Sequence, residues 1–147
     1  MGHFATGVTV VTVATDGEPT GLSVNSFTSV SLDPPLVAFC VARASSTWPL
    51  IRAAGAFCVN ILGEDQEDVC RVFARPGPKR FQGIGWQPAP SGAPILADVL
   101  AWVDCTVEAE HDAGDHLIVV GGVRDARVVR EGRPLVFYRG GYGRFEP

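Results

Sequence analysis

The chain has 147 residues, 46% of them apolar, and a formal net charge of −4. This length predicts one domain, residues 1–147, with enough apolar residues to build a core, and the composition excludes an intrinsically disordered chain. The negative charge argues against nucleic acid or an anionic membrane surface as a partner.

The cysteines lie far apart in sequence, within apolar or amphipathic segments: Cys40, Cys58, Cys70 and Cys105. No pair has the spacing of a zinc or redox motif, so we expect buried thiols in a reducing compartment. The N-terminus shows no signal-peptide pattern, and the longest apolar run, LVAFCVA, is too short to cross a bilayer. The expected location is the cytoplasm, with no membrane association.

The first two predicted strands form a hairpin. Gly7 to Thr15 is rich in β-branched residues, and Asp16-Gly17 is a turn signal that leads into the segment GLSVNSFTSVSLDPP, residues 21–35. This segment alternates apolar and polar residues through Val24, but Phe27 falls out of step before the original phase returns. A strand that changes phase must bulge or bend, which turns its side chains toward whatever lies beside the sheet.

The predicted bend carries short polar side chains: Asn25, Ser26, Thr28, Ser29 and Ser31. Together with the N–H groups that a bulge leaves unpaired, their hydroxyl and amide groups can hold a phosphate without a glycine-rich loop. The same residues also fit the solvent-exposed face of an antiparallel strand. The residues alone leave both interpretations open.

A buried strand and a short helix are predicted next. Asp33-Pro34-Pro35 ends the second strand, and the apolar run Leu36 to Ala42 predicts a strand buried on both faces. Ser45-Ser46-Thr47 ahead of Pro49 predicts a helix start, and Gly55 predicts its end. The serine hydroxyls can either cap this helix or contribute to an anion site, because the two share the same N-terminal amides.

The second half of the chain contains one long irregular segment, Arg75 to Pro94, which includes Lys79 and Arg80. A loop of that length in a compact domain is usually functional or mobile. The other expected elements are strands at Phe57–Leu62, Val99–Glu110, Leu117–Val129 and Leu135–Tyr138, an amphipathic helix at Glu64–Ala74, a connection at His111–His116 and a glycine-rich tail, GGYGRFEP. Six or seven short strands with two short helices indicate a mainly β fold, a closed or nearly closed antiparallel barrel.

The run FATGVTVVTVATDGEPTGLSVNSFTSVSLDPPLVAFCV resembles the opening of the flavin reductase-like family, which has the FMN-binding split-barrel fold. FCVNIL, Arg80-Phe81, the GDH motif at Gly114 to His116 and PLVFYRGGY follow in the family's order. Such proteins usually have a helix ahead of the FATGVTVVT segment, where only Met1-Gly2-His3 stand here. The resemblance implies an antiparallel split β-barrel with two short helices.

In function, the resemblance implies an NAD(P)H-dependent flavin reductase, which transfers hydride from NADH or NADPH to FMN or FAD and supplies reduced flavin to a partner monooxygenase. The flavin contacts that it implies lie along the bend: Asn25, Ser26, Phe27, Thr28, Ser29, Val30 and Ser31. Ser45 and Ser46 fall at a family-like position after the third strand, and Lys79 or Arg80 is a candidate charge partner for the flavin phosphate.

His116 is the candidate catalytic residue, because its imidazole can stack on the nicotinamide carboxamide or hydrogen-bond to it. The alternative is an exposed turn histidine, and Asp115 is expected to order the turn by capping backbone amides. Tyr142 is expected either to cover the cofactor or a dimer groove, or to pack on the surface. Asn60 is interpreted as a structural amide with satisfied hydrogen bonds.

Hydride transfer needs no protein nucleophile and no essential acid, since the cofactors carry the reaction, and no metal site is expected. The exposed edges of a split barrel and its shallow groove predict a homodimer. Two other functions stay open: a flavoprotein with tightly bound FMN that transfers electrons or acts on another small molecule, and a non-catalytic module that binds flavin or haem.

Overall fold

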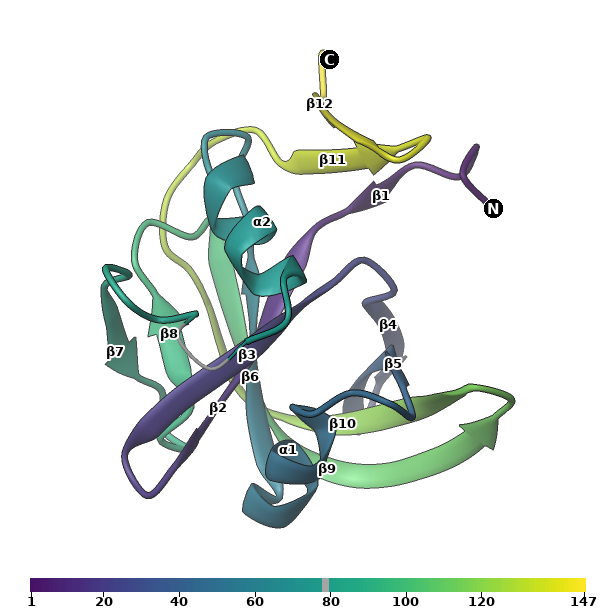
Figure 1. Ribbon diagram of the computed structural model, residues 1–147, viewed down its shortest axis with the longest axis vertical. Helices are drawn as coiled ribbons and strands as arrows, with labels where there is room; N and C mark the ends of the chain where they lie inside the picture. The colour runs from purple at the N-terminus through teal and green to yellow at the C-terminus, as the bar shows by residue number, and fades with distance from the viewer. Residues whose placement is uncertain (78–79) are drawn as a thin grey trace.

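The structure is a computed structural model that describes residues 1–77 and 80–147 (Figure 1). Its strands are β1 (Thr6–Gly7), β2 (Thr9–Thr15), β3 (Glu18–Val24), β4 (Thr28–Leu32), β5 (Pro35–Ala42), β6 (Ala56–Ile61), β7 (Trp86–Pro88), β8 (Pro94–Leu96), β9 (Ala101–Ala113), β10 (His116–Val128), β11 (Leu135–Tyr138) and β12 (Gly141–Arg144). The helices are α1 (Trp48–Ala54) and α2 (Glu67–Ala74). No helix in the described ranges is long and apolar enough to cross a membrane.

The main sheet has seven strands in the order β3-β2-β6-β9-β10-β5-β4, and every neighbouring pair is antiparallel. Its two edge strands, β3 and β4, are consecutive in the chain and are joined only by Asn25, Ser26 and Phe27. Four Cα steps of about 3.8 Å connect Val24 to Thr28, so the two edges lie within about 15 Å of each other. The sheet therefore rolls into a barrel whose first and last strands do not pair, which confirms the predicted split barrel.

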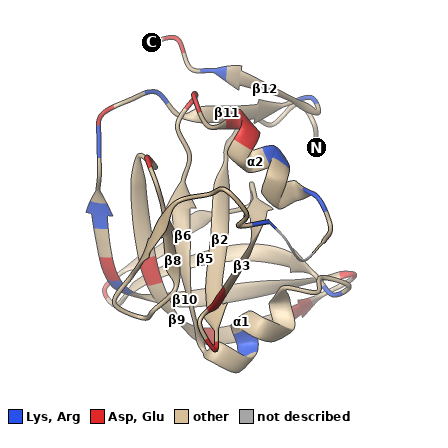
Figure 2. Cartoon of the chain, turned by 60° about the vertical axis from the view of Figure 1, so that its left-hand side comes forward, with Lys and Arg blue, Asp and Glu red and all other residues tan. Residues whose placement is uncertain are grey.

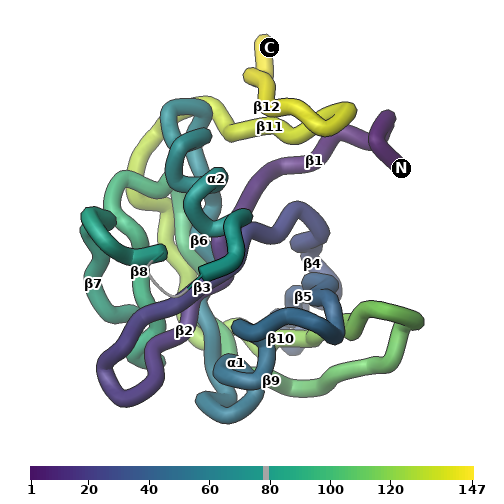
Figure 3. The backbone as a smooth tube through the Cα atoms, viewed as in Figure 1, coloured from purple at the N-terminus to yellow at the C-terminus, as the bar shows by residue number. Residues whose placement is uncertain are grey.

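We call the unpaired junction between β3 and β4 the seam. Figure 3 shows the backbone as a ring of strands, with β3 and β4 on opposite sides of a gap that side chains fill. These side chains form one core cluster inside the barrel, which includes Val11, Phe39 and Phe57. A second cluster includes Val10, Phe73 and Trp102 and lies under α2 and the loop that carries β7 and β8. Consecutive valines of β2 thus face two different cores, which explains why both of its faces are apolar.

Helix α1 follows the sequence prediction. Ser45 Oγ accepts hydrogen bonds from the backbone N–H groups of Thr47, at 3.2 Å, and Trp48, at 3.3 Å. The helix ends at Gly55, which has a φ of 70° and whose N–H donates to the Ile51 carbonyl. That left-handed conformation costs glycine little, which is why glycine stops helices so often.

Helix α2 begins at Glu67, three residues later than Glu64. The backbone N–H of Glu64 donates to the carbonyl of Arg133 at 2.8 Å, and Gly63 pairs with Pro134, so this segment is tied to the chain before β11 and cannot join the helix. The helix buries Cys70 and Phe73. Its exposed face carries both acidic and basic residues, which Figure 2 shows in red and blue.

Three other element predictions were wrong or incomplete. The predicted connection at His111–His116 is part of a long hairpin: β9 continues to Ala113, β10 starts at His116, and only Gly114 and Asp115 form the turn. The glycine-rich tail contains β12, which pairs with β11, and the long loop contains β7, which pairs with β8. Cys40 is exposed and not buried, since it lies on the outer face of β5 opposite Ile118.

Candidate functional site

The seam contains the bend that the phase change predicted. The pairing of β4 with β5 shifts between Ser29 and Ser31, so Val30 is left unpaired as a bulge. Ser29 and Val30 are exposed, and Val30 retains 52% of its accessible surface. Phe27 instead turns inward and packs against the core inside the barrel. The bend therefore anchors itself with one aromatic ring and presents its polar residues outward.

Ser26 holds the bend to the neighbouring strand. Its Oγ accepts a hydrogen bond from the backbone N–H of Cys40 at 2.8 Å and donates to the Cys40 carbonyl at 3.3 Å. If β4 continued past Thr28, its backbone would bond to this N–H and this carbonyl of Cys40. The Ser26 hydroxyl bonds to both groups in place of the backbone. Thr28 Oγ1 donates to the carbonyl of Ser29 at 3.2 Å.

A groove of about 400 Å³ lies beside this bend. The bend contributes Asn25, Ser26, Phe27 and Thr28 to its lining. The N-terminal segment and the start of β2 contribute Phe4, Ala5, Thr6, Gly7, Val8 and Thr9, and β6 contributes Ile61. Thr6 Oγ1 is buried and has no hydrogen-bond partner within the described residues.

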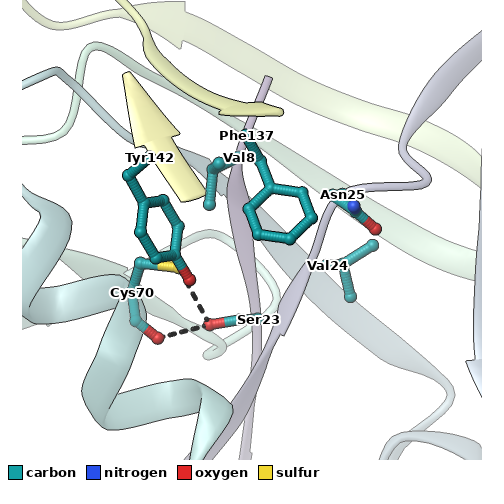
Figure 4. A pocket seen from close by; sticks show the side chains of 7 residues that line it. All are labelled: Val8, Ser23, Val24, Asn25, Cys70, Phe137 and Tyr142. Carbon is teal, nitrogen blue, oxygen red and sulfur yellow. Dashed lines mark hydrogen bonds between the residues drawn. The ribbon is translucent and has the colours of Figure 1, made fainter. Parts of the chain in front are cut away.

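A second cavity of about 190 Å³ adjoins this groove (Figure 4). Val8 and Asn25 line both spaces, so the two are neighbours, and we call them together the two-part groove. The remaining lining residues of the second cavity come from β3, α2 and the C-terminal hairpin: Ser23, Val24, Cys70, Phe137 and Tyr142. None of these five except Tyr142 was predicted as a site residue. Ser23 continues the polar alternation toward Asn25, a signal that could have identified it.

Tyr142 is fixed in the second cavity by contacts with α2. Its Oη lies 3.2 Å from Cys70 Sγ, and the Arg71 guanidinium lies 4.9 Å from the centre of its ring. Ser23 Oγ donates to the Cys70 carbonyl at 2.7 Å, which ties β3 to the same point on the helix. Burial, followed by the contact with Cys70, raises the pKa of Tyr142 to about 12, so the phenol stays neutral and can donate a hydrogen bond at neutral pH.

The candidate phosphate partners have different environments. Ser45 Oγ accepts from the N–H groups of Thr47 and Trp48 at the start of α1, whereas Ser46 is exposed and makes no side-chain hydrogen bond in the described part of the chain. The Arg80 guanidinium donates to the Gly21 carbonyl on the free edge of β3, and its Nε is buried without a partner. No carboxylate pairs with Arg80 in residues 1–77 and 80–147, and burial lowers the pKa of its guanidinium. Lys79 lies outside the described residues.

Strand β5 aligns the bend with His116. Thr28 pairs with Ala38, Ser26 binds Cys40, and His116 pairs with Ala42 on the other side of β5. Alternate residues of a strand share a face and are about 7 Å apart, so these groups follow one another along one face of the sheet. The structure thus brings together two parts of the candidate site that are about ninety positions apart in the sequence.

The donor set matches a planar anionic ligand better than a metal ion. Within the described ranges, no group of three His, Cys, Asp or Glu residues is close enough to hold a metal. The two-part groove combines apolar and aromatic walls with a few hydroxyl and amide groups, and the nearby Arg80 has no acidic partner in the described chain. Such a combination suits an aromatic ring system that carries a phosphate.

Comparison with known proteins agrees with this geometry. The family model described as "Flavin reductase like domain" matches residues 1–146. The chain is 46% identical over 147 residues to a protein of Rhodococcus jostii named "Flavin-dependent monooxygenase, reductase subunit HsaB", covering 100% of this chain and 75% of that protein. It is 45% identical over 145 residues to "FMN reductase (NADH) SmoA" of Agrobacterium fabrum, covering 99% of this chain and 82% of that protein.

Among solved structures, the chain is similar to nitrilotriacetate monooxygenase component B from Mycobacterium thermoresistibile. The TM-score is 0.97 at 48% sequence identity, and the match covers 99% of this chain and 83% of that one. The structural similarity therefore extends over the barrel, both helices and the seam.

Proposed function

The chain belongs to the flavin reductase-like family, and from this premise we infer that it is an NAD(P)H:flavin oxidoreductase whose flavin lies in the two-part groove at the seam. The observation that carries this assignment of the site is the groove beside the bend, which is lined by Asn25 to Thr28 and by the N-terminal segment. The flavin, when bound, supplies the ring that accepts hydride.

The chain's own residues would bind and orient the ring. We assign contacts with the ring to the bend: Asn25, Ser26, Phe27, Thr28, Ser29, Val30 and Ser31. As partners of the phosphate we propose Ser45, Ser46, Lys79 and Arg80. Backbone N–H groups freed at the Val30 bulge can donate to the polar edge of the ring. Tyr142 and Phe137 exclude water from the inner end of the groove.

We assign the nicotinamide contact to His116, which lies on the same face of the sheet as Thr28. For the cosubstrates we propose FMN and NADH, because the Agrobacterium relative is named for that pair. FAD and NADPH are the alternatives that the assay below compares. The exposed free thiol of Cys40, with the three other free cysteines, supports a reducing compartment such as the cytoplasm.

Two partners follow from this function. A flavin-dependent monooxygenase would receive the reduced flavin, as the name of the Rhodococcus relative describes for that protein. A second copy of this chain would cover the seam: β4 is an edge strand with an exposed bulge, and Leu32 on it retains 90% of its accessible surface. Light scattering at two protein concentrations tests this proposed homodimer.

A flavin titration tests the function. The purified protein is assayed for NADH and NADPH oxidation while FMN or FAD is added. A reductase that uses flavin as a dissociable substrate is nearly colourless when purified, and its rate rises and saturates with added flavin. A yellow protein whose rate does not respond to added flavin would support tightly bound FMN, and the lack of any NAD(P)H turnover would support a non-catalytic module.

A further inference from the structure

A network of charged residues surrounds the end of the β9–β10 hairpin, outside the two-part groove. Arg43 follows β5 directly, and its side chain reaches across to the hairpin turn. Its Nε donates to the Gly114 carbonyl at 2.8 Å, and its Nη2 donates to Asp112 Oδ1 at 2.7 Å. The backbone N–H of Arg43 also donates to the Asp115 carbonyl at 3.0 Å. Three hydrogen bonds from one residue therefore hold this turn against the end of β5.

The turn carries an Asp–His pair. Asp115 Oδ1 lies 2.7 Å from His116 Nδ1. The hydrogen bond from His116 lowers the pKa of the Asp115 carboxyl, so this group is ionised at neutral pH and can only accept a hydrogen bond. The contact therefore favours a proton on His116 Nδ1, which in the neutral imidazole leaves Nε2 as the acceptor. The sequence predicted that Asp115 would cap backbone amides; its carboxylate interacts with its own backbone N–H and also contacts the imidazole.

This pair is poorly placed to stabilise the fold. The side chains of Asp115 and His116 retain 96% and 48% of their accessible surface. Ion pairs as exposed as this one add little to stability, because water screens them. What the arrangement does influence is orientation: Arg43 holds the position of the turn, and the contact with Asp115 favours the His116 tautomer that is protonated on Nδ1.

We propose that Arg43 and Asp115 are positioning residues for His116, and that they present its Nε2 as a hydrogen-bond acceptor for the carboxamide N–H of the nicotinamide. The identity of the ligand rests on the proposed function. The orientation and tautomer of His116 are properties of the protein alone and can be measured without turnover.

The first test is a long-range ¹H–¹⁵N NMR spectrum of protein labelled at its histidines, recorded where the imidazoles are neutral. We expect His116 in the Nδ1–H form in the wild type and a shift toward the Nε2–H form in Asp115→Ala. Asp115→Asn, which keeps an acceptor oxygen, restores the Nδ1–H form. A spectrum of His116→Gln separates its signals from those of His3 and His111. Asp125→Ala, which removes an exposed carboxylate from the far end of β10, serves as the matched control and leaves the tautomer unchanged.

The second test is kinetic. Asp115→Ala and Arg43→Gln should raise the KM for NADH about three- to tenfold, the effect expected for one misplaced hydrogen bond, while flavin affinity stays the same. The proposal is overturned if His116 carries its proton on Nε2 in the wild-type protein, or if the KM for NADH is unchanged in Asp115→Ala. A wild type with the expected tautomer but no NAD(P)H turnover instead overturns the proposed function and the nicotinamide as ligand, and leaves the orientation of His116 established.

Discussion

Asn60 shows how one buried polar side chain joins three strands. Its Nδ2 donates to the Val10 carbonyl at 3.1 Å and to Thr12 Oγ1 and the Pro94 carbonyl at 3.2 Å. Its Oδ1 accepts from the Leu96 N–H at 2.8 Å. The side chain is fully buried, so the prediction of a structural amide is confirmed.

Asn60→Ala should lower the free energy of unfolding by about 2 kcal/mol, because several buried backbone groups lose their partners at once. Urea denaturation measures the change. Gln87→Ala is the control, since Gln87 is exposed and its loss should change stability by less than about 0.5 kcal/mol. Equal stability in the two variants would mean that water replaces the amide.

Ser26 has two roles in our assignment, one in the fold and one in flavin binding. Replacing Ser26 and Thr28 together by Ala should weaken FMN binding by about 1–3 kcal/mol, because charged acceptors lose donors. Thr28→Ala alone separates the two effects, since the Thr28 hydroxyl bonds only to the adjacent residue and its loss should leave stability unchanged. Fluorescence titration with FMN gives the affinity; an unchanged Kd in the double variant would place the phosphate elsewhere.

His116→Ala should raise the KM for NADH about tenfold and leave the Kd for FMN unchanged, because we assign this residue to the nicotinamide alone. Steady-state kinetics and the same FMN titration measure the two quantities. His111→Ala provides the comparison: His111 lies on β9 next to Ile118, and its removal should affect neither. Loss of FMN binding in His116→Ala with an intact KM would contradict the assignment.

At the scale of elements, the regular pairing of β9 with β10 is interrupted where the hairpin crosses the core. The register shifts between Val120 and Gly121, where the strand crosses the barrel core. A Cβ on Gly121 would lie 2.6 Å from Cζ of Phe57 and 3.1 Å from Cβ of Cys105. The packing of the core therefore requires a glycine at this point. The register shift falls where the backbone of β10 lies directly against the Phe57 ring.

Gly121→Ala should destabilise the protein by about 1–3 kcal/mol, the usual cost of overpacking a core. Thermal unfolding followed by circular dichroism measures the effect. In Gly143→Ala a Cβ would meet no atom within 4 Å, so this variant should keep the wild-type melting temperature. If both variants melt like the wild type, Phe57 has room to move aside.

Element boundaries also show where sequence patterns are weak. The segment His111–His116 suggested a connection, but His111 and Asp112 pair with Ile118 and Leu117 and extend the strand. A strand end is decided by where the partner strand stops, and a local pattern does not contain that information. The bend at Phe27 could be predicted, in contrast, because a phase change is visible in the residues themselves.

At the scale of the whole molecule, the four thiols differ in how deeply they are buried. Cys40 is exposed, while Cys58, Cys70 and Cys105 are buried. Burial, reinforced by the negative charge of Asp104, raises the pKa of Cys105 from the ordinary 9.0 to about 12, and the pKa of Cys58 is raised by the same causes. These two thiols are therefore neutral and inaccessible in the native protein at neutral pH.

A thiol reagent at pH 8 should label one cysteine in the native protein and all four after denaturation. Cys40→Ser should reduce the native value to zero. Because the folded-state pKa values are raised, the stability that these neutral thiols contribute is complete below pH 9 and is lost as the pH rises toward 12. Denaturant midpoints measured from pH 8 upward should therefore fall. Labelling of more than one thiol in the native protein at pH 8 would contradict the burial of Cys58, Cys70 and Cys105.

The sequence by itself determined the fold class, the bend at the seam, helix α1 and the family, because hydrophobic phase, turn residues and motif order are local properties of the chain. Only the tertiary structure decided that Val8, Ser23, Cys70 and Phe137 line a cavity with Asn25 and Tyr142, and that Arg43 contacts the turn before His116. These neighbours come from segments that lie far apart in the chain. Strand order and register bring them together, and no local pattern encodes such contacts.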